Sequence, residues 1–215
     1  KSALARALAG DLTLLKGTRE NSFAHIVRLS FEQLQKLVSD EWQRNNTDLL
    51  SEGEDDTGRT TAEIIQDEVR DPARCAALAA QFGIEKLLDR RFKYLSTGET
   101  RKTLLCQVLM QQPDLLVLDE PFDGLDVNAR AQLAELLEKL SAEGQTMVLV
   151  LNRFDDIPAF VKNVGVLADC TLASVGLREQ VMADALVAQL AHSESLNGMA
   201  VPEAEDPTAR ISPPA

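Results

Sequence analysis

The sequence has few cysteines and lacks long apolar runs, the features that would indicate a disulfide-rich protein and a membrane-spanning protein, respectively. Its 215 residues contain three cysteines, Cys75, Cys106 and Cys170, which are widely spaced and form no metal-binding pattern. An odd, scattered set of cysteines does not make a disulfide framework, so we expect reduced thiols and a cytoplasmic location. Long apolar runs are also lacking, since a run such as Met147–Leu151 has the length of a strand and not of a membrane span.

Basic residues are scarce as well. The chain carries 22 lysines and arginines against 34 aspartates and glutamates, which gives a formal net charge of -12. Nucleic-acid binding depends on a basic surface, so we expect no nucleic-acid partner. The remaining composition, with 45% hydrophobic and 26% charged residues, is that of a soluble globular protein with one core and room for a tail.

The chain is organised around one apolar run that ends in two carboxylates. Leu115–Leu118 is followed directly by Asp119, Glu120 and Pro121. A short apolar run predicts a fully buried strand, and open α/β sheets bind their ligands at the carboxyl ends of such strands. One carboxylate, Asp119, can hold Mg²⁺, and the other, Glu120, can orient a water for attack on a phosphate.

Caps and apolar periodicity predict the elements around this strand. Thr60 and Ser96 each open a capping box, Asp126 is a helix N-cap, and Gly10 ends the first helix. The expected helices cover residues 1–10, 60–70, 73–82, 97–111, 127–143 and 177–190, with a short helix or turn at 84–91 and an exposed loop at 42–56. The expected strands cover residues 25–29, 115–118, 146–151, 164–168 and 171–175, of which the last two form a hairpin and the others a parallel sheet.

Two further motifs flank the carboxylates. Residues 95–99 read Leu-Ser-Thr-Gly-Glu, and residues 124–126 read Gly-Leu-Asp. In this order and spacing, the three motifs resemble the signature sequence, the Walker B strand and the D-loop of ATP-binding cassette (ABC) ATPases. Thr97 and Glu99 depart from the family signature, which reads Leu-Ser-Gly-Gly-Gln. A capped helix N-terminus with a glycine that permits close approach suits a phosphate, although an ordinary helix start is the alternative.

The resemblance implies an α/β fold: a P-loop NTPase parallel sheet with a helical signature subdomain at about residues 40–112, within a nucleotide-binding domain of residues 1–190. It implies ATP as substrate and Mg²⁺ as cofactor. Lys1 would be the phosphate-binding lysine that ends a P-loop, and Ser2 would share Mg²⁺ with Asp119. The glycines of that loop would precede Lys1, so the N-terminal part of the cassette is expected to be missing and the isolated chain to bind ATP poorly.

In the family, the signature and D-loop complete the site of an opposing cassette in a head-to-tail dimer. This role falls on Ser96, Thr97, Gly98, Glu99 and Asp126. A partner cassette is therefore implied, either in the same chain or in a homodimer. Glu99 places a negative charge near a triphosphate, at a cost on the order of a kcal/mol unless Arg101 or Lys102 compensates.

Two positions depart from the family pattern more strongly. Asn152, followed by Arg153, stands where the resemblance places a catalytic switch histidine, and an asparagine cannot carry a proton or a positive charge. Phe31 stands where the family has the Q-loop glutamine. Gln33 is the candidate for that role, with a helix-surface position as the alternative for Gln33 and for Gln35.

Residues 191–215 are acidic and rich in proline, which predicts a linker toward a second cassette. Residues 32–42 and 90–100 resemble a tandem-cassette member of the family associated with molybdate transport. The implied function is an ATP-binding and ATP-hydrolysing cassette for such transport, with a membrane permease subunit as a further partner at the inner face of the membrane. The alternatives are a non-hydrolytic regulatory ATP-binding module and a soluble tandem ABC protein that acts on ribosomes or nucleic acid.

Overall fold

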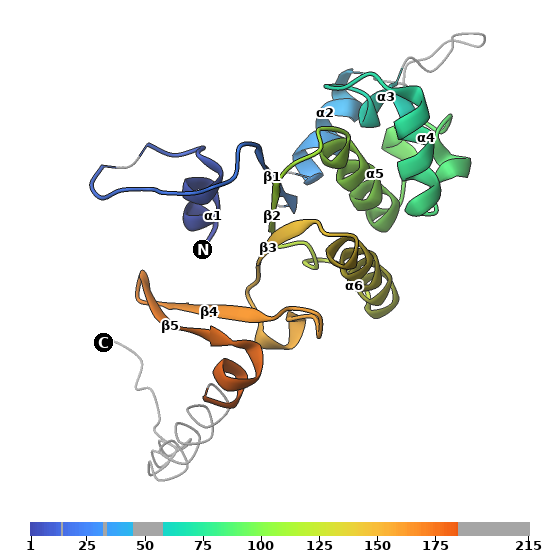
Figure 1. The fold of residues 1–215 in the computed structure, drawn as a ribbon. Coiled ribbons are helices and arrows are strands. Elements are labelled where there is room, and N and C mark those ends of the chain that lie inside the picture. Colours follow the sequence, from blue (N-terminus) through green and yellow to red (C-terminus); the bar gives the residue numbers. More distant parts are fainter. Residues whose placement is uncertain (14, 32–33, 45–57, 185–215) are drawn as a thin grey trace, which may run out of the picture. The chain divides into compact units, whose positions relative to one another are not determined.

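The computed structural model describes residues 1–13, 15–31, 34–44 and 58–184 (Figure 1). The chain divides into two compact units, Lys1–Phe160 and Val161–Ala215. The first unit contains a parallel sheet with helices on both faces, and the second contains a hairpin that is followed by helical residues. Gln33, residues 45–57 and residues 191–215, on which several predictions fall, lie outside the described residues.

The sheet is parallel, as predicted, and its strand order is β1-β2-β3. Strand β1 spans Ile26–Ser30, β2 spans Leu115–Asp119 and β3 spans Thr146–Val150. Every residue of the central strand β2 is buried, which confirms the prediction from its apolar run. The register pairs Asp119 with Ser30 on one side and with Val150 on the other, so the carboxyl ends of all three strands meet at one edge.

Alternate residues of β2 face opposite sides of the sheet, as the two-residue period of a strand requires. On one face, Leu115 and Val117 pack with Ala5 of helix α1 (Ser2–Ala9). On the other face, Leu116 and Leu118 belong to the main hydrophobic core. Helix α1 ends as predicted at Gly10, whose φ of 91° is a left-handed C-cap conformation.

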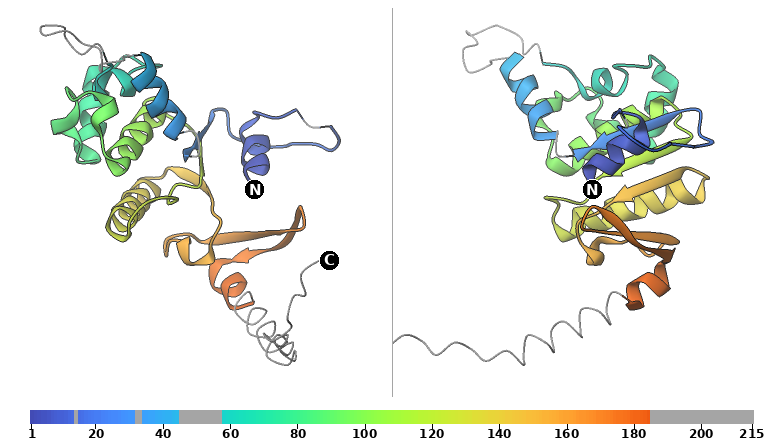
Figure 2. Two further views of the ribbon diagram at one scale, coloured as in Figure 1. Left: turned by 180° about the vertical axis from the view of Figure 1, so that it is seen from behind. Right: turned by 90° about the vertical axis from the view of Figure 1, so that its left-hand side faces the viewer.

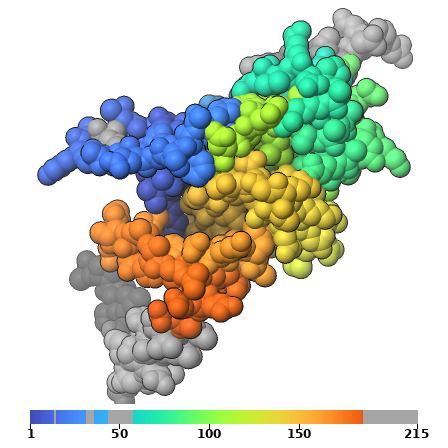
Figure 3. Space-filling view, viewed as in Figure 1, coloured from blue at the N-terminus to red at the C-terminus, as the bar shows by residue number. Residues whose placement is uncertain are grey.

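A cluster of helices precedes β2 (Figure 2). It contains α2 (Leu34–Arg44), α3 (Thr61–Ile65), α4 (Pro72–Gln81), the 3₁₀ turns Glu85–Leu87 and Phe92–Tyr94, and α5 (Thr97–Met110). Helix α5 contacts α3, α4 and β1. Because α5 is enclosed by these elements, Thr100, Arg101 and Thr103 are buried as well as its leucines. In the space-filling view of Figure 3, the residues of α3 and α4, coloured teal to green, form one continuous surface.

Several element boundaries differ from the prediction. Helix α3 ends at Ile65 and not at residue 70. Gln66 is its C-cap, and the next helix begins only after Asp71, whose backbone is extended before Pro72. Helix α2 continues to Arg44, so Trp42 is helical and does not begin the loop. Strand β1 begins one residue later than expected, and β3 ends one residue earlier.

Helix α6 spans Val127–Ala142 and begins at the predicted N-cap, Asp126. Its buried stripe of Leu133, Leu137 and Leu140 packs into the main core. The second unit contains the predicted antiparallel hairpin, β4 (Asn163–Ala168) and β5 (Thr171–Leu177), with helical residues at 178–184. The helix predicted from residue 177 thus starts one residue later, since Leu177 still pairs with Asn163.

All three cysteines have free thiols in the structure, as expected; Cys75 and Cys106 are buried and Cys170 is exposed. Among the described residues, no helix has the length and apolar character needed to cross a membrane.

Candidate nucleotide site

Ser2 and Asp119, the two predicted metal ligands, meet at the carboxyl edge of the sheet. The Ser2 hydroxyl donates a hydrogen bond to Asp119 Oδ1 at 3.1 Å, from the first residue of α1 to the last residue of β2. Asp119 is only 2% exposed, and its second oxygen, Oδ2, is buried without a hydrogen-bond partner among the described residues. A buried carboxylate oxygen without a donor is costly, and a serine hydroxyl beside it completes an oxygen pair of the kind that Mg²⁺ prefers.

Lys1 and Asn152 also meet, although they are far apart in the sequence. The Lys1 ammonium donates a hydrogen bond to Asn152 Oδ1 at 3.0 Å. Lys1 is the N-cap of α1, and Asn152 follows the end of β3. Both side chains are exposed, so the residue predicted to bind phosphate and the residue in the switch position lie together at the open edge of the sheet.

Glu120 leaves the strand through an unusual backbone conformation. Its φ of 56° lies in the left-handed region, which a glutamate rarely adopts, and its backbone N–H donates to the Val150 carbonyl at 2.9 Å. The pKa of Glu120 is raised above its ordinary value, chiefly because burial desolvates the carboxylate and then because Asp119 and Asp123 repel it, while Lys1 opposes the shift. A carboxylate with a raised pKa is a stronger base, as the catalytic role of Glu120 would require.

The signature residues form the predicted capping box. Ser96 Oγ accepts from the backbone N–H of Glu99 at 3.3 Å, and the Glu99 carboxylate accepts from the backbone N–H of Ser96 at 2.7 Å. This second bond is the main reason why the pKa of Glu99 is lowered, with smaller contributions from the charges of Arg90 and Lys102. Glu99 therefore stabilises the start of α5 as a cap residue.

The signature and the D-loop residues line one cleft of about 430 Å³. Ser96, Thr97, Gly98 and Glu99 lie along it with Gly124 and Asp126. Asp126 Oδ1 accepts from the backbone N–H of Ala129 at 2.9 Å, which caps α6 beside the cleft. All the described residues that the sequence assigned to an opposing nucleotide thus share a single surface.

Arg101 was one of the two residues, with Lys102, that were expected to compensate the charge of Glu99, and it does not do so. Its side chain is 4% exposed and donates hydrogen bonds to the carbonyls of Pro121 and Asp123. The guanidinium also lies 4.9 Å from the centre of the Phe31 ring. The burial of Arg101 could have been predicted from its helical spacing with Leu104, Leu105 and Val108. This spacing places Arg101 on the apolar side of α5.

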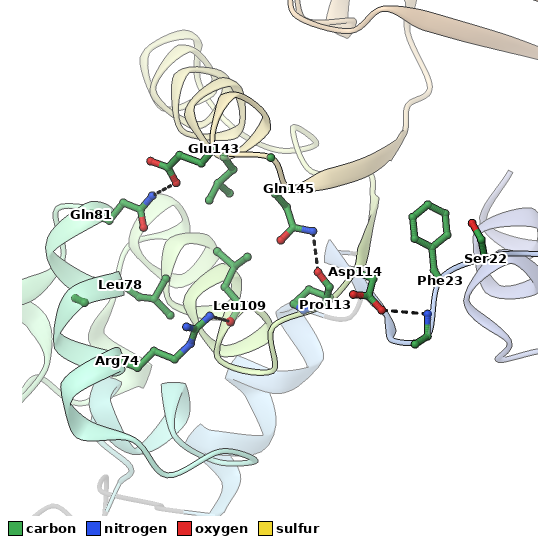
Figure 4. Close-up of a pocket in the computed structure, with 14 residues that line it drawn as sticks. Ser22, Phe23, Arg74, Leu78, Gln81, Leu109, Pro113, Asp114, Glu143 and Gln145 are labelled. Atoms are coloured by element: carbon green, nitrogen blue, oxygen red, sulfur yellow. Dashed lines mark hydrogen bonds between the residues drawn. The ribbon is translucent and has the colours of Figure 1, made fainter.

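A larger hollow, of about 810 Å³, lies at the opposite, amino ends of the strands (Figure 4). Several of its polar groups are already paired with one another, as the dashed lines in Figure 4 show. The bonds join Arg74 to the Leu109 carbonyl at 2.7 Å, Gln81 to Glu143 at 2.8 Å and Gln145 to the Pro113 carbonyl at 3.0 Å. The site of interest is therefore the carboxyl edge with Asp119.

Comparison with known proteins identifies the class to which this fold and site belong. The family described as "ABC transporter" matches residues 1–123. The chain belongs to this family of ATP-binding cassette proteins. Its members are ATPases that bind ATP, generally with Mg²⁺, and that generally dimerise and work with membrane permeases.

Individual relatives support the same assignment. The chain is 72% identical over 215 residues to the ABC transporter ATP-binding protein ModF of Escherichia coli (strain K12), covering 100% of this chain and 44% of ModF. It is 40% identical over 91 residues to the energy-coupling factor transporter ATP-binding protein EcfA2 of Lacticaseibacillus paracasei, which covers 42% of this chain and 32% of EcfA2. The chain therefore spans less than half the length of these relatives.

Solved structures show the same fold. A nucleotide-free ATP-binding cassette from an ABC transporter matches with a TM-score of 0.67 and 18% identity, over 86% of this chain and 79% of that one. An ATP-binding cassette in its ADP conformation matches with a TM-score of 0.66 and 18% identity, over 85% and 78% of the two chains. These matches confirm the predicted α/β P-loop NTPase fold class.

Proposed function

We propose that this chain is the ATP-binding and ATP-hydrolysing cassette of an ABC protein. The observation that carries the proposal is the buried Asp119 carboxylate. One of its oxygens accepts a hydrogen bond from the Ser2 hydroxyl, and the other accepts none from the residues that the structure describes. Ser2 and Asp119 are the residues that would hold Mg²⁺. When bound, this ion neutralises negative charge on the phosphate oxygens.

The residues around this pair have complementary roles in the proposal. Lys1 binds a phosphate oxygen in place of Asn152, because its ammonium is exposed and needs only to exchange one acceptor for another. Glu120 accepts a proton from the attacking water or orients it. Asn152 donates a hydrogen bond from its amide to the phosphate, since it cannot supply a positive charge. Catalysis of this kind is mainly positioning and electrostatic stabilisation.

The cleft lined by Ser96, Thr97, Gly98, Glu99 and Asp126 serves a nucleotide held by an opposing cassette in this proposal. That partner is a second ABC cassette in the same chain or in a homodimer. Association with molybdate transport, with a permease subunit at the inner face of the cell membrane, is the finer proposal, and it rests on the resemblance of residues 32–42 and 90–100. The assignment of Gln33 as a nucleotide contact also stays a prediction.

The two capping boxes provide a matched test of the proposed function. Ser96→Ala and Thr60→Ala each remove an N-cap hydroxyl, so each should lower the free energy of unfolding by about 1 kcal/mol. Only Ser96→Ala should also lower the rate of ATP hydrolysis, because Thr60 lies outside the cleft. The measurements are denaturant unfolding and steady-state MgATP hydrolysis in the full-length protein that carries this chain.

Equal turnover in these two variants would remove Ser96 from the nucleotide site. If the unmodified protein binds ATP but does not hydrolyse it, the regulatory ATP-binding module replaces the enzyme as the function of this chain.

The raised pKa of Glu120 predicts the pH dependence of hydrolysis. A base acts in its deprotonated form, so kcat/KM should fall as the pH drops through a value above the ordinary 4.5 of a glutamate. Asp123→Asn removes one of the charges that raise this pKa, so the acid limb of the profile should move to lower pH. An acid limb that stays in place in Asp123→Asn would contradict Glu120 as the group that titrates.

A further inference from the structure

Arg28 places a positive charge inside the candidate metal site. It lies in the middle of β1, paired in register with Val117 of β2, and its side chain is only 14% exposed. Its Nε donates to Asp11 Oδ2 at 2.7 Å, just beyond the end of α1. Its Nη1 lies 3.8 Å from Asp119 Oδ2, the oxygen that has no hydrogen-bond partner in the described part of the chain.

The guanidinium is thus shared between two carboxylates at unequal distances. The pair with Asp11 is a direct hydrogen bond, whereas 3.8 Å to Asp119 is within reach of an ion pair but too long for a hydrogen bond. A buried carboxylate needs a compensating positive charge. Arg28 supplies this charge to Asp119 without donating a hydrogen bond to Oδ2. That oxygen therefore remains available to a ligand.

We propose that Arg28 sets the metal affinity of the site: it compensates Asp119 while no metal is bound and repels the divalent cation that binds there. The proposal rests on the proposed function, because it takes Asp119 and Ser2 as the Mg²⁺ ligands. A cation that binds Oδ2 comes within a few ångströms of the guanidinium, and like charges at that separation repel each other even near the protein surface. Asp11 moderates the repulsion because it neutralises Arg28.

This arrangement predicts opposite effects for the two members of the Arg28–Asp11 pair. Arg28→Gln removes the repelling charge and should tighten metal binding at least about tenfold. Asp11→Asn leaves the charge of Arg28 unbalanced and should weaken metal binding several-fold. Both substitutions break the same ion pair, so a purely structural role for that pair would move the affinity in one direction in both variants.

The test is a titration of the full-length protein with Mn²⁺ alone, without nucleotide, followed through the electron paramagnetic resonance signal of free Mn²⁺. Matched controls are Arg70→Gln and Asp89→Asn, which remove the same charges from exposed positions. Asp119→Asn identifies the site, since it should abolish the binding that the other variants change. Melting temperatures establish that each variant is folded.

Opposite shifts of the dissociation constant in Arg28→Gln and Asp11→Asn, each larger than in its control, would support the inference. Any other pattern overturns it, provided that Asp119→Asn removes one bound Mn²⁺ per protein. If no variant binds Mn²⁺, or if the number of bound Mn²⁺ ions is unchanged in Asp119→Asn, the metal site of the proposed function itself is overturned. Failure of the inference and failure of the site are therefore distinguishable.

Discussion

Glu120→Gln is expected to lower the rate of MgATP hydrolysis at least about 100-fold while ATP binding is retained. The substitution replaces a base with an amide of the same shape, which cannot accept a proton from water. The backbone bond from residue 120 to the Val150 carbonyl does not involve the side chain, so the turn should be preserved. The measurements are steady-state hydrolysis and equilibrium nucleotide binding in the full-length protein.

The matched control for this substitution is Glu85→Gln, which makes the same chemical change at an exposed residue of a 3₁₀ turn. The control should leave both hydrolysis and binding unchanged. Unchanged turnover in Glu120→Gln would show that this carboxylate is not the catalytic one. A parallel loss of binding and turnover would instead indicate that Glu120 supports nucleotide binding.

Arg101→Met is expected to lower the free energy of unfolding by about 2–4 kcal/mol. The methionine keeps much of the volume but removes the hydrogen bonds to the carbonyls of Pro121 and Asp123, which then lie near an apolar side chain. Burial already lowers the pKa of Arg101, which indicates that its environment disfavours an unpaired charge. Urea unfolding followed by circular dichroism measures the change.

A matched comparison is Arg74→Met, because Arg74 lies only partly buried on α4 and donates to one main-chain carbonyl, that of Leu109. Its loss should cost about 1 kcal/mol. If Arg101→Met costs no more than Arg74→Met, the bonds of Arg101 to the chain after Glu120 contribute little. If Arg101→Lys is as stable as the unmodified protein, a single positive charge is sufficient at this position and the forked geometry of the guanidinium is not required.

Local signals in the sequence predicted the local parts of this structure. The capping boxes of Ser96 and Thr60 and the cap at Asp126 form where they were expected, because each depends on residues three positions apart. The buried strand β2 likewise follows from four consecutive apolar residues. The end of α3 was missed, because residues 66–70 contain no glycine or proline that would mark it.

The site combines residues that are far apart in the chain, and no local pattern joins them. Ser2 and Asp119 were paired only through the resemblance to ABC ATPases, and their hydrogen bond now supports that pairing. Arg28 could not be found in this way, since an arginine within a short strand gives no sign of which carboxylates lie on its face of the sheet. Its relation to Asp11 and Asp119 depends on how α1 packs on β1 and β2.

The hydrogen bonds of Arg101 have a consequence for communication within the cassette. One rigid, planar group fastens the first turns of α5, beside the cleft, to the main chain that follows Glu120. Any ligand that shifts the start of α5 must therefore shift or strain the backbone that follows Glu120, the carboxylate proposed to act in hydrolysis. A ligand bound in the cleft then changes the affinity for a ligand near Glu120 by some factor. By thermodynamic reciprocity, a ligand bound near Glu120 changes the affinity of the cleft for its own ligand by the same factor.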